Sequence, residues 1–226
     1  IHWLFNMIAL TAVGFPLERQ FGSGALLYIF LVSGFMGNIF SAIFSPLTIG
    51  VGASGGVFGI FGAAWSDLIL NYSLYKGRVC RIFVQLFCVT FLNLIVGLIP
   101  YVDNFAHIGG LLTGMIAGFG VLVANRYSRY GELKERKRYQ LVLQIMSAVL
   151  IPVLIVVCLF VLYLGEPGEW CSWCHYMSCV QFPPGPNPWW TCDSCSNVGI
   201  QATLHSNGTV TLLCPDGVQV VTPTIP

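Results

Sequence analysis

The stretch "VGASGGVFG", residues 51–59, places four glycines around a single serine, Ser54, at the start of an apolar run. Small residues at every fourth position let two helices approach closely inside a membrane. A serine at such a contact is either a packing residue or a group that performs chemistry. The rest of the sequence is needed to decide between these two interpretations.

The composition favours a membrane protein. Of the 226 residues, 56% are hydrophobic and only 8% are charged, with a mean hydropathy of +0.77. Soluble domains carry about 25% charged residues. We therefore expect a polytopic membrane protein whose surroundings are the lipid bilayer. The net charge of +1 gives no reason to expect a nucleic-acid partner.

The apolar segments predict an all-α fold, a polytopic bundle of transmembrane helices, since a spanning helix needs about 20 apolar residues. Six segments are visible: 1–15, 24–45, 51–71, 82–99, 105–124 and 141–164. Residues 165–226 are rich in Pro, Cys, Ser, Asn and Trp and predict a small extramembrane tail. The chain does not begin with Met and starts within an apolar segment, so we expect an N-terminally truncated fragment.

The basic residues predict the topology. All ten lie in alternate loops: Arg19; Lys76, Arg78 and Arg81; and Arg126, Arg129, Lys134, Arg136, Lys137 and Arg138. Cytosolic loops collect Lys and Arg, so these loops, including the basic loop 125–140, are expected in the cytosol. The tail then lies in a lumen or outside the cell, and the protein is expected in the secretory pathway, in the Golgi, another endomembrane or the plasma membrane.

Rare polar groups gather near the lumenal face of this topology. Ser54, His107, His2 and Asn6 each lie near the lumenal start of a predicted segment. Polar and ionisable groups inside spanning helices are costly and by default suggest function. A channel or transporter would instead line a whole helix face with such groups.

Two glycine stripes predict that Ser54 and His107 meet. The segment "AHIGGLLTGMIAG", residues 106–118, carries glycines at every fourth position on the face of His107. The stripes are Gly110, Gly114 and Gly118 on this segment, and Gly55, Gly59 and Gly62 after Ser54. Packing of one stripe on the other would bring the serine and the histidine toward hydrogen-bond distance.

A serine near a histidine indicates nucleophilic catalysis. Serine needs a base to remove its proton, and histidine is the natural base near neutral pH. His2 and Asn6, spaced i and i+4, and the backbone N–H of Ser54 are candidate donors to an oxyanion. Asp103, one turn before His107, is an alternative third member, but the pattern favours a Ser–His dyad.

Several motifs in order resemble the rhomboid intramembrane serine proteases. Over residues 2–124 these are "HWLFN", "PLERQFGSG" as a Leu-Glu turn, "SGFMGN", "GASGGVFG" and "AHIGGLLTG". The resemblance implies that Ser54 is the nucleophile and His107 the general base, with His2, Asn6 and the Ser54 amide as the oxyanion hole. Supporting roles are implied for Gly52, Gly55, Phe58, Gly110 and Gly114.

The resemblance also implies the division of the chain. Residues 1–124 correspond to the catalytic membrane core without the first helix of the family, and 141–164 to an extra C-terminal helix. The expected activity is hydrolysis of peptide bonds in or near transmembrane segments of substrate proteins, without a metal or other cofactor. The alternative is a rhomboid-like adaptor that binds transmembrane clients without cleaving them.

The tail carries a cysteine pattern with two interpretations. Its six cysteines are Cys171, Cys174, Cys179, Cys192, Cys195 and Cys214, and two C-x-x-C pairs among them match the spacing of a zinc site. A lumenal tail favours disulfides, which form in oxidising compartments. Asn207 begins an "NGT" glycosylation sequon usable in a lumen, whereas the sequon at Asn71 is expected at the cytosolic end and unused. Resemblance to plant secretory-pathway rhomboids rests on this tail.

Overall fold

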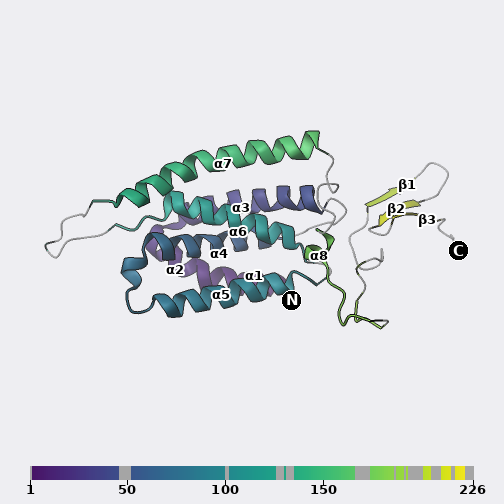
Figure 1. The fold of residues 1–226 in the computed structure, drawn as a ribbon, viewed down its shortest axis with the longest axis horizontal. Helices are drawn as coiled ribbons and strands as arrows, with labels where there is room; N and C mark the ends of the chain where they lie inside the picture. The colour runs from purple at the N-terminus through teal and green to yellow at the C-terminus, as the bar shows by residue number, and fades with distance from the viewer. Residues whose placement is uncertain are drawn as a thin grey trace.

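The computed structural model describes residues 2–45, 52–99, 102–125, 130, 135–165, 174–185, 187–190, 192, 201–204, 210–214 and 217–221. The long helices lie side by side with their axes roughly parallel (Figure 1), and most of the described residues are helical. The polytopic helical bundle expected from the apolar segments is therefore confirmed.

The N-terminal helix is continuous but changes its winding. It consists of α1 (His2–Ala9), a π-helical turn (Leu10–Gly14) and α2 (Phe15–Phe21). Pro16 has no backbone N–H, and its ring would crowd the carbonyl four residues earlier, so the wider π turn just before it relieves this conflict. The expected turn at "PLERQFGSG" is wrong for residues 16–21, which are helical, and the chain turns only at Gly22, whose φ is 87°.

The centre of the bundle is formed by α3 (Ser23–Phe44), α4 (Ser54–Leu70) and α6 (Asn104–Val121). Almost every residue of α4 is buried, because α3, α6 and the N-terminal helix surround it. A helix that is apolar on all sides is stable only when other helices or lipid surround it. The helix that begins with Ser54 is therefore the most enclosed element of the fold.

Two helices lie at the periphery. Only 6% of α5 (Val79–Val96) is buried inside the protein, whereas 56% of α6 is buried. Helix α7 (Arg138–Leu164) packs on α3 and α6 and lies along the upper edge of Figure 1. The many exposed apolar side chains of α5 and α7 suit a lipid environment.

Within the described residues, four helices, α3, α5, α6 and α7, are long and apolar enough to cross a membrane. Helix α4 is shorter, at 17 residues, because it begins at Ser54 rather than at residue 51 and ends at Leu70. The observed ends of the other segments differ from the predicted ones by a few residues, as expected for helix boundaries.

The chain reverses direction from one long helix to the next, so the long helices begin alternately at the two ends of the bundle. The starts of α1, α4 and α6 lie at the right-hand end of the bundle in Figure 1, and the described basic residues flank helix ends on the left. Those described residues are Arg19, Lys76, Arg78, Arg81, Arg136, Lys137 and Arg138. Ser54 and His107 therefore share one end of the bundle, opposite the described cations.

The tail has structure of its own at the right-hand end. It contains the short helix α8 (His175–Ser178) and an antiparallel sheet of β1 (Gln201–Leu204), β2 (Val210–Cys214) and β3 (Gly217–Val221) in the order β1-β2-β3. The register pairs Gln201 with Leu213 and Cys214 with Gly217. These strands are an addition to the all-α expectation and are confined to the tail.

Candidate active site

Ser54 is the first residue of α4. It follows Ala53, which occupies the N-cap position, and Gly52, which lies in a bend just before the helix. The N–H groups of a first helical turn have no carbonyl partner within the helix, so the N–H of Ser54 is available at the helix end. Only 8% of Ser54 is exposed. A hydroxyl and backbone N–H groups thus meet at one buried helix terminus.

His107 lies in the first turn of α6 and is 5% exposed. The helix is capped by Asp103, whose carboxylate accepts a hydrogen bond of 3.0 Å from the N–H of Ala106. A carboxylate at an N-cap stabilises the helix terminus by satisfying a free N–H group. The structure therefore gives Asp103 the role of a helix cap.

The two glycine stripes lie directly against each other. A Cβ atom on Gly110 would lie 2.8 Å from the carbonyl carbon of Gly55, and one on Gly114 would lie 2.5 Å from that of Gly59. Both distances are shorter than real Cβ contacts. A Cβ on Gly62 would likewise meet the backbone of α6, 2.6 Å from the nitrogen of Met115. The glycines allow α4 and α6 to touch backbone to backbone.

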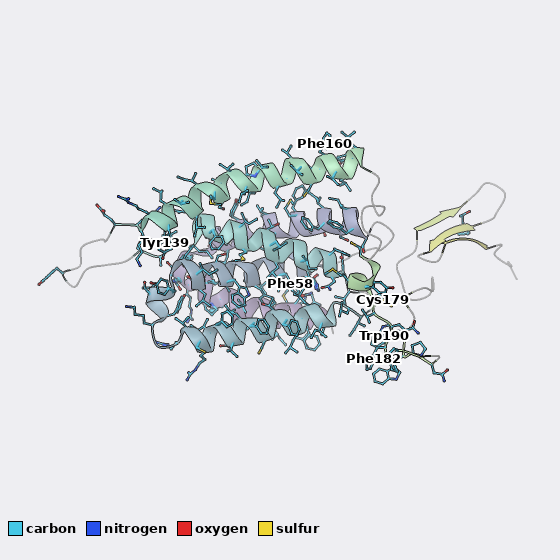
Figure 2. The ribbon with its side chains drawn as sticks, viewed as in Figure 1. Phe58, Tyr139, Phe160, Cys179, Phe182 and Trp190 are labelled. Atoms are coloured by element: carbon cyan, nitrogen blue, oxygen red, sulfur yellow. A yellow bond between two sulfur atoms is a disulfide. The ribbon has the colours of Figure 1, made fainter. Side chains whose placement is uncertain are left out.

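Phe58 connects the two helices at the level of the site. Its ring stacks on the imidazole of His107, with ring centroids 4.0 Å apart and planes inclined by 12°. Phe58 follows Ser54 by four residues, so both side chains lie on the same face of α4. The imidazole of His107 is therefore placed over the face of α4 that carries Ser54. Figure 2 labels Phe58 toward the end of the bundle where α6 begins.

The N-terminal helix approaches the same region. Ala9, Leu10 and Val13 pack against the cluster of Val57, Phe58 and Phe61. Asn6 precedes Ala9 by three residues and Leu10 by four, and it therefore shares the face that packs there. His2 begins α1, but its side chain lies outside the described part of the structure.

Three of the tail cysteines are in disulfides. Cys179 is bonded to Cys192, at an S–S distance of 2.03 Å, and Cys174 is disulfide-bonded as well. The backbone of Cys214 lies in β2, while Cys171, Cys195 and Asn207 lie outside the described residues. The bond to Cys179 removes Cys192 from a zinc set built on the two C-x-x-C pairs. Within the described residues, no group of three His, Cys, Asp or Glu side chains is placed to hold a metal.

Two features were not anticipated from the sequence. Asn104, 3% exposed, bonds to a residue of the tail, and Asp67, 5% exposed, lies in a hydrogen-bonded network at the opposite end of α4. An aspartate within an apolar helix was a visible signal of the second feature. Nothing in the sequence indicated the first, because its partner is a backbone carbonyl 73 residues away.

Comparisons with known proteins agree with this arrangement. The chain is 41% identical to "RHOMBOID-like protein 6, mitochondrial" of Arabidopsis thaliana and 42% identical to "RHOMBOID-like protein 2" of the same plant, in each case over 85% of the chain. It is also 32% identical to "Inactive rhomboid protein 1" of Rattus norvegicus over 91% of the chain. The chain spans 64% and 61% of the two plant relatives and 22% of the rat protein. Because the profile of the Rhomboid domain matches residues 1–124, the chain belongs to the rhomboid family.

Proposed function

We propose that the protein is an intramembrane serine endopeptidase that hydrolyses peptide bonds in or near transmembrane segments of other membrane proteins. The observation that carries the proposal is the stacking of His107 on Phe58, one helical turn from Ser54, at a glycine contact between α4 and α6. A serine used only for packing does not require a histidine held over the same helix face.

In the proposed mechanism Ser54 Oγ attacks the substrate carbonyl carbon while His107 accepts the hydroxyl proton. His107 then donates this proton to the leaving amine, which releases one product and leaves an acyl-enzyme. Water attacks the ester, again with His107 as the base, and restores the Ser54 hydroxyl. The negative charge on the carbonyl oxygen is stabilised by the N–H of Ser54 and by Asn6 and His2 as further donors.

A substrate helix has an apolar approach along the side of the bundle. A cavity of about 520 Å³ lies between the N-terminal helix, α4 and α5, and its walls extend from Phe5 and Phe61 to Asp67 and Tyr75 near the opposite end of α4. Since α5 is mostly exposed to lipid, a transmembrane segment would reach this cavity from the side. Helices shelter their peptide bonds, so Gly or Pro near the cleavage site of the substrate is expected to favour hydrolysis.

The proposed topology places the tail in a lumen or outside the cell. The described basic residues flank the end of the bundle opposite the tail, as expected for a cytosolic face. The Cys179–Cys192 disulfide suits an oxidising compartment, and we therefore propose the secretory pathway. One relative carries the word mitochondrial in its name, so the compartment has to be tested by localising the full-length protein.

The second candidate is a rhomboid-like adaptor that binds transmembrane clients without cleaving them. It is favoured by one observation, the 32% identity to a rat protein named an inactive rhomboid. The presence of both Ser54 and His107, buried and on contacting helices, favours the protease.

Labelling with a fluorophosphonate, which reacts with activated serines, tests the proposal. We expect the full-length protein in membranes to be labelled and to cleave a reporter with one transmembrane helix. Ser54→Ala and His107→Ala are each expected to abolish labelling and cleavage, whereas Ser23→Ala, at the opposite end of the bundle, retains both. A folded wild-type protein that neither labels nor cleaves would support the adaptor.

A further inference from the structure

We propose that a segment of the tail positions His107 through Asn104, so that the tail is part of the catalytic unit. The segment, called the strap below, comprises the described residues between Cys174 and Cys192. This inference rests on the proposed function and adds to it a positioning residue outside the set that touches substrate.

The strap is attached by one hydrogen bond to the start of α6 and by another to the loop before it. Asn104 Nδ2 donates to the carbonyl oxygen of Met177 at 2.9 Å, and the backbone N–H of Val180 donates to the carbonyl oxygen of Leu98 at 2.9 Å. Leu98 lies in the connection between α5 and α6, and Asn104 is the first residue of α6. The strap therefore contacts both ends of the loop that leads into α6, the helix that carries His107.

Asn104 is fixed on its other side by the end of α5. A Cβ atom on Gly97 would lie 2.6 Å from Cγ of Asn104, so the amide fits only because residue 97 is a glycine. Asn104 precedes His107 by three residues and lies on the same side of the first turn of α6. A helical turn is stiff, so a displacement of Asn104 also displaces the imidazole.

The strap is itself held closed. The Cys179–Cys192 disulfide joins its two arms. Trp190 Nε1 donates to the carbonyl oxygen of Val180 at 2.8 Å, and the backbone N–H of Trp189 donates to the carbonyl oxygen of Phe182 at 2.8 Å. Figure 2 shows Cys179, Phe182 and Trp190 together beyond the right-hand end of the bundle. The carbonyl oxygen of Val180 thus accepts a hydrogen bond within the strap, whereas its N–H donates the hydrogen bond that attaches the strap to Leu98.

A small loosening of this attachment is expected to affect the rate more than substrate binding. A misplacement of about 1 Å in a catalytic geometry costs up to about 100-fold in rate. Asn104 and the strap are not in the substrate cavity described above, so the KM for a transmembrane substrate should change little.

The test is a matched pair of variants of the full-length protein. Val180→Pro removes the N–H that bonds to Leu98, whereas Val180→Ala keeps this N–H and removes only side-chain atoms. Asn104→Leu is a second variant of similar volume that lacks the donor to Met177. For all four proteins we would measure kcat and KM on a transmembrane reporter, the rate of fluorophosphonate labelling, and amide hydrogen exchange in residues 104–108.

If the strap positions His107, Val180→Pro and Asn104→Leu lower kcat and the labelling rate by about 10-fold to 100-fold with KM unchanged. Both variants also exchange faster than wild type in the first turn of α6, and Val180→Ala behaves as wild type. Unchanged exchange in Val180→Pro overturns the proposal, whether or not the wild type is active. Faster exchange with unchanged kcat and labelling also overturns it.

The failure of the proposed function has a different signature. A wild-type protein that does not label contradicts the protease and with it this role of the strap. A wild-type protein that labels, together with variants that label equally fast, contradicts the strap alone.

Discussion

The ring of Phe58 determines the plane in which the imidazole of His107 lies, because the two rings stack within 12° of parallel. The N-cap of α6 and the strap on Asn104 fix the backbone that carries His107, while Phe58 fixes the ring. A general base is useful only when its nitrogen is directed at the proton that it removes. The orientation of one side chain thus depends on three separate parts of the chain.

Replacing Phe58 by Leu is expected to lower kcat/KM of the proposed protease without unfolding it. Stacked aromatic pairs contribute about 0.5–1.5 kcal/mol beyond their buried area, which corresponds to at most about tenfold in rate. Reporter cleavage measures the effect. Phe91→Leu, on the lipid-facing α5, is the control and should change nothing. Equal activity of the two variants would contradict a role for the stacking.

Replacing Gly114 by Ala is expected to destabilise the bundle. The added methyl group would lie 2.5 Å from the carbonyl carbon of Gly59, so α4 and α6 would have to separate, at a cost of about 1–3 kcal/mol. Gly24→Ala is the matched control, since apart from the adjacent residues and the backbone of its own helix no atom lies within 4 Å of its Cβ position. Thermal unfolding in detergent should show a lower midpoint for Gly114→Ala only. Equal midpoints would mean that the helices separate without cost.

At the scale of elements, α4 joins two polar regions. Ser54 lies at its first residue, and near its other end Asn71 Nδ2 donates to Asp67 Oδ1 and to the carbonyl oxygen of Leu122, both at 2.7 Å. The hydroxyl of Tyr75 donates to Asp67 Oδ2. Burial, and then the bond to Asp67, raise the pKa of Tyr75 above its ordinary value of 10.0, so the hydroxyl keeps its proton and remains a donor further into the alkaline range than an ordinary tyrosine. The network ties α4 to the end of α6.

Replacing Asn71 by Leu is expected to lower the stability of the bundle. Asn71 is fully buried, and its Oδ1 also accepts from the N–H of Ala124 at 3.2 Å. The change leaves buried partners without hydrogen bonds, at about 1–3 kcal/mol for each group. Gln20→Ala removes an exposed partner of Tyr75 and serves as the control. The midpoints of thermal unfolding should differ, and similar midpoints would show that water replaces the lost bonds.

At the scale of the whole molecule, the tail and the described basic residues lie at opposite ends of the bundle (Figure 1). The two glycosylation sequons lie in different parts of the chain: the one at Asn71 is close in sequence to the basic residues Lys76 to Arg81, and the one at Asn207 belongs to the tail. Asn71 is fully buried and hydrogen-bonded through both ends of its amide. Its amide is therefore inaccessible to a glycosyltransferase in the folded protein, regardless of the compartment.

We expect the full-length protein to be glycosylated at Asn207 and not at Asn71. Treatment with an endoglycosidase should increase its mobility in gel electrophoresis, and Asn207→Gln should abolish this shift. The physical reason is the proposed topology, which places the tail in the lumen. A protein whose mobility is insensitive to the enzyme, although it passes through the secretory pathway, would contradict the lumenal tail.

The sequence alone determined the helical bundle and the end at which Ser54 and His107 lie. Apolar length sets which segments span a membrane, and Lys and Arg set their direction, so both follow from local composition. The contact between α4 and α6 could also be predicted from their glycine stripes, because close contact between membrane helices requires small residues at a fixed spacing. The continuation of the first helix through residues 16–21 was missed, because a proline normally predicts a break and the π turn before it is not visible in the sequence.

Only the tertiary structure decided which polar groups meet across long separations. Asn104 and Met177 are 73 residues apart, and the acceptor is a main-chain carbonyl that every residue possesses, so no side-chain pattern marks it. The pairing of Cys179 with Cys192 had the same origin, because six cysteines allow 15 connectivities and only proximity in the fold selects one. Local periodicity thus defines the helices of this protein, whereas the attachment of its tail depends on contacts that form only when the chain is folded.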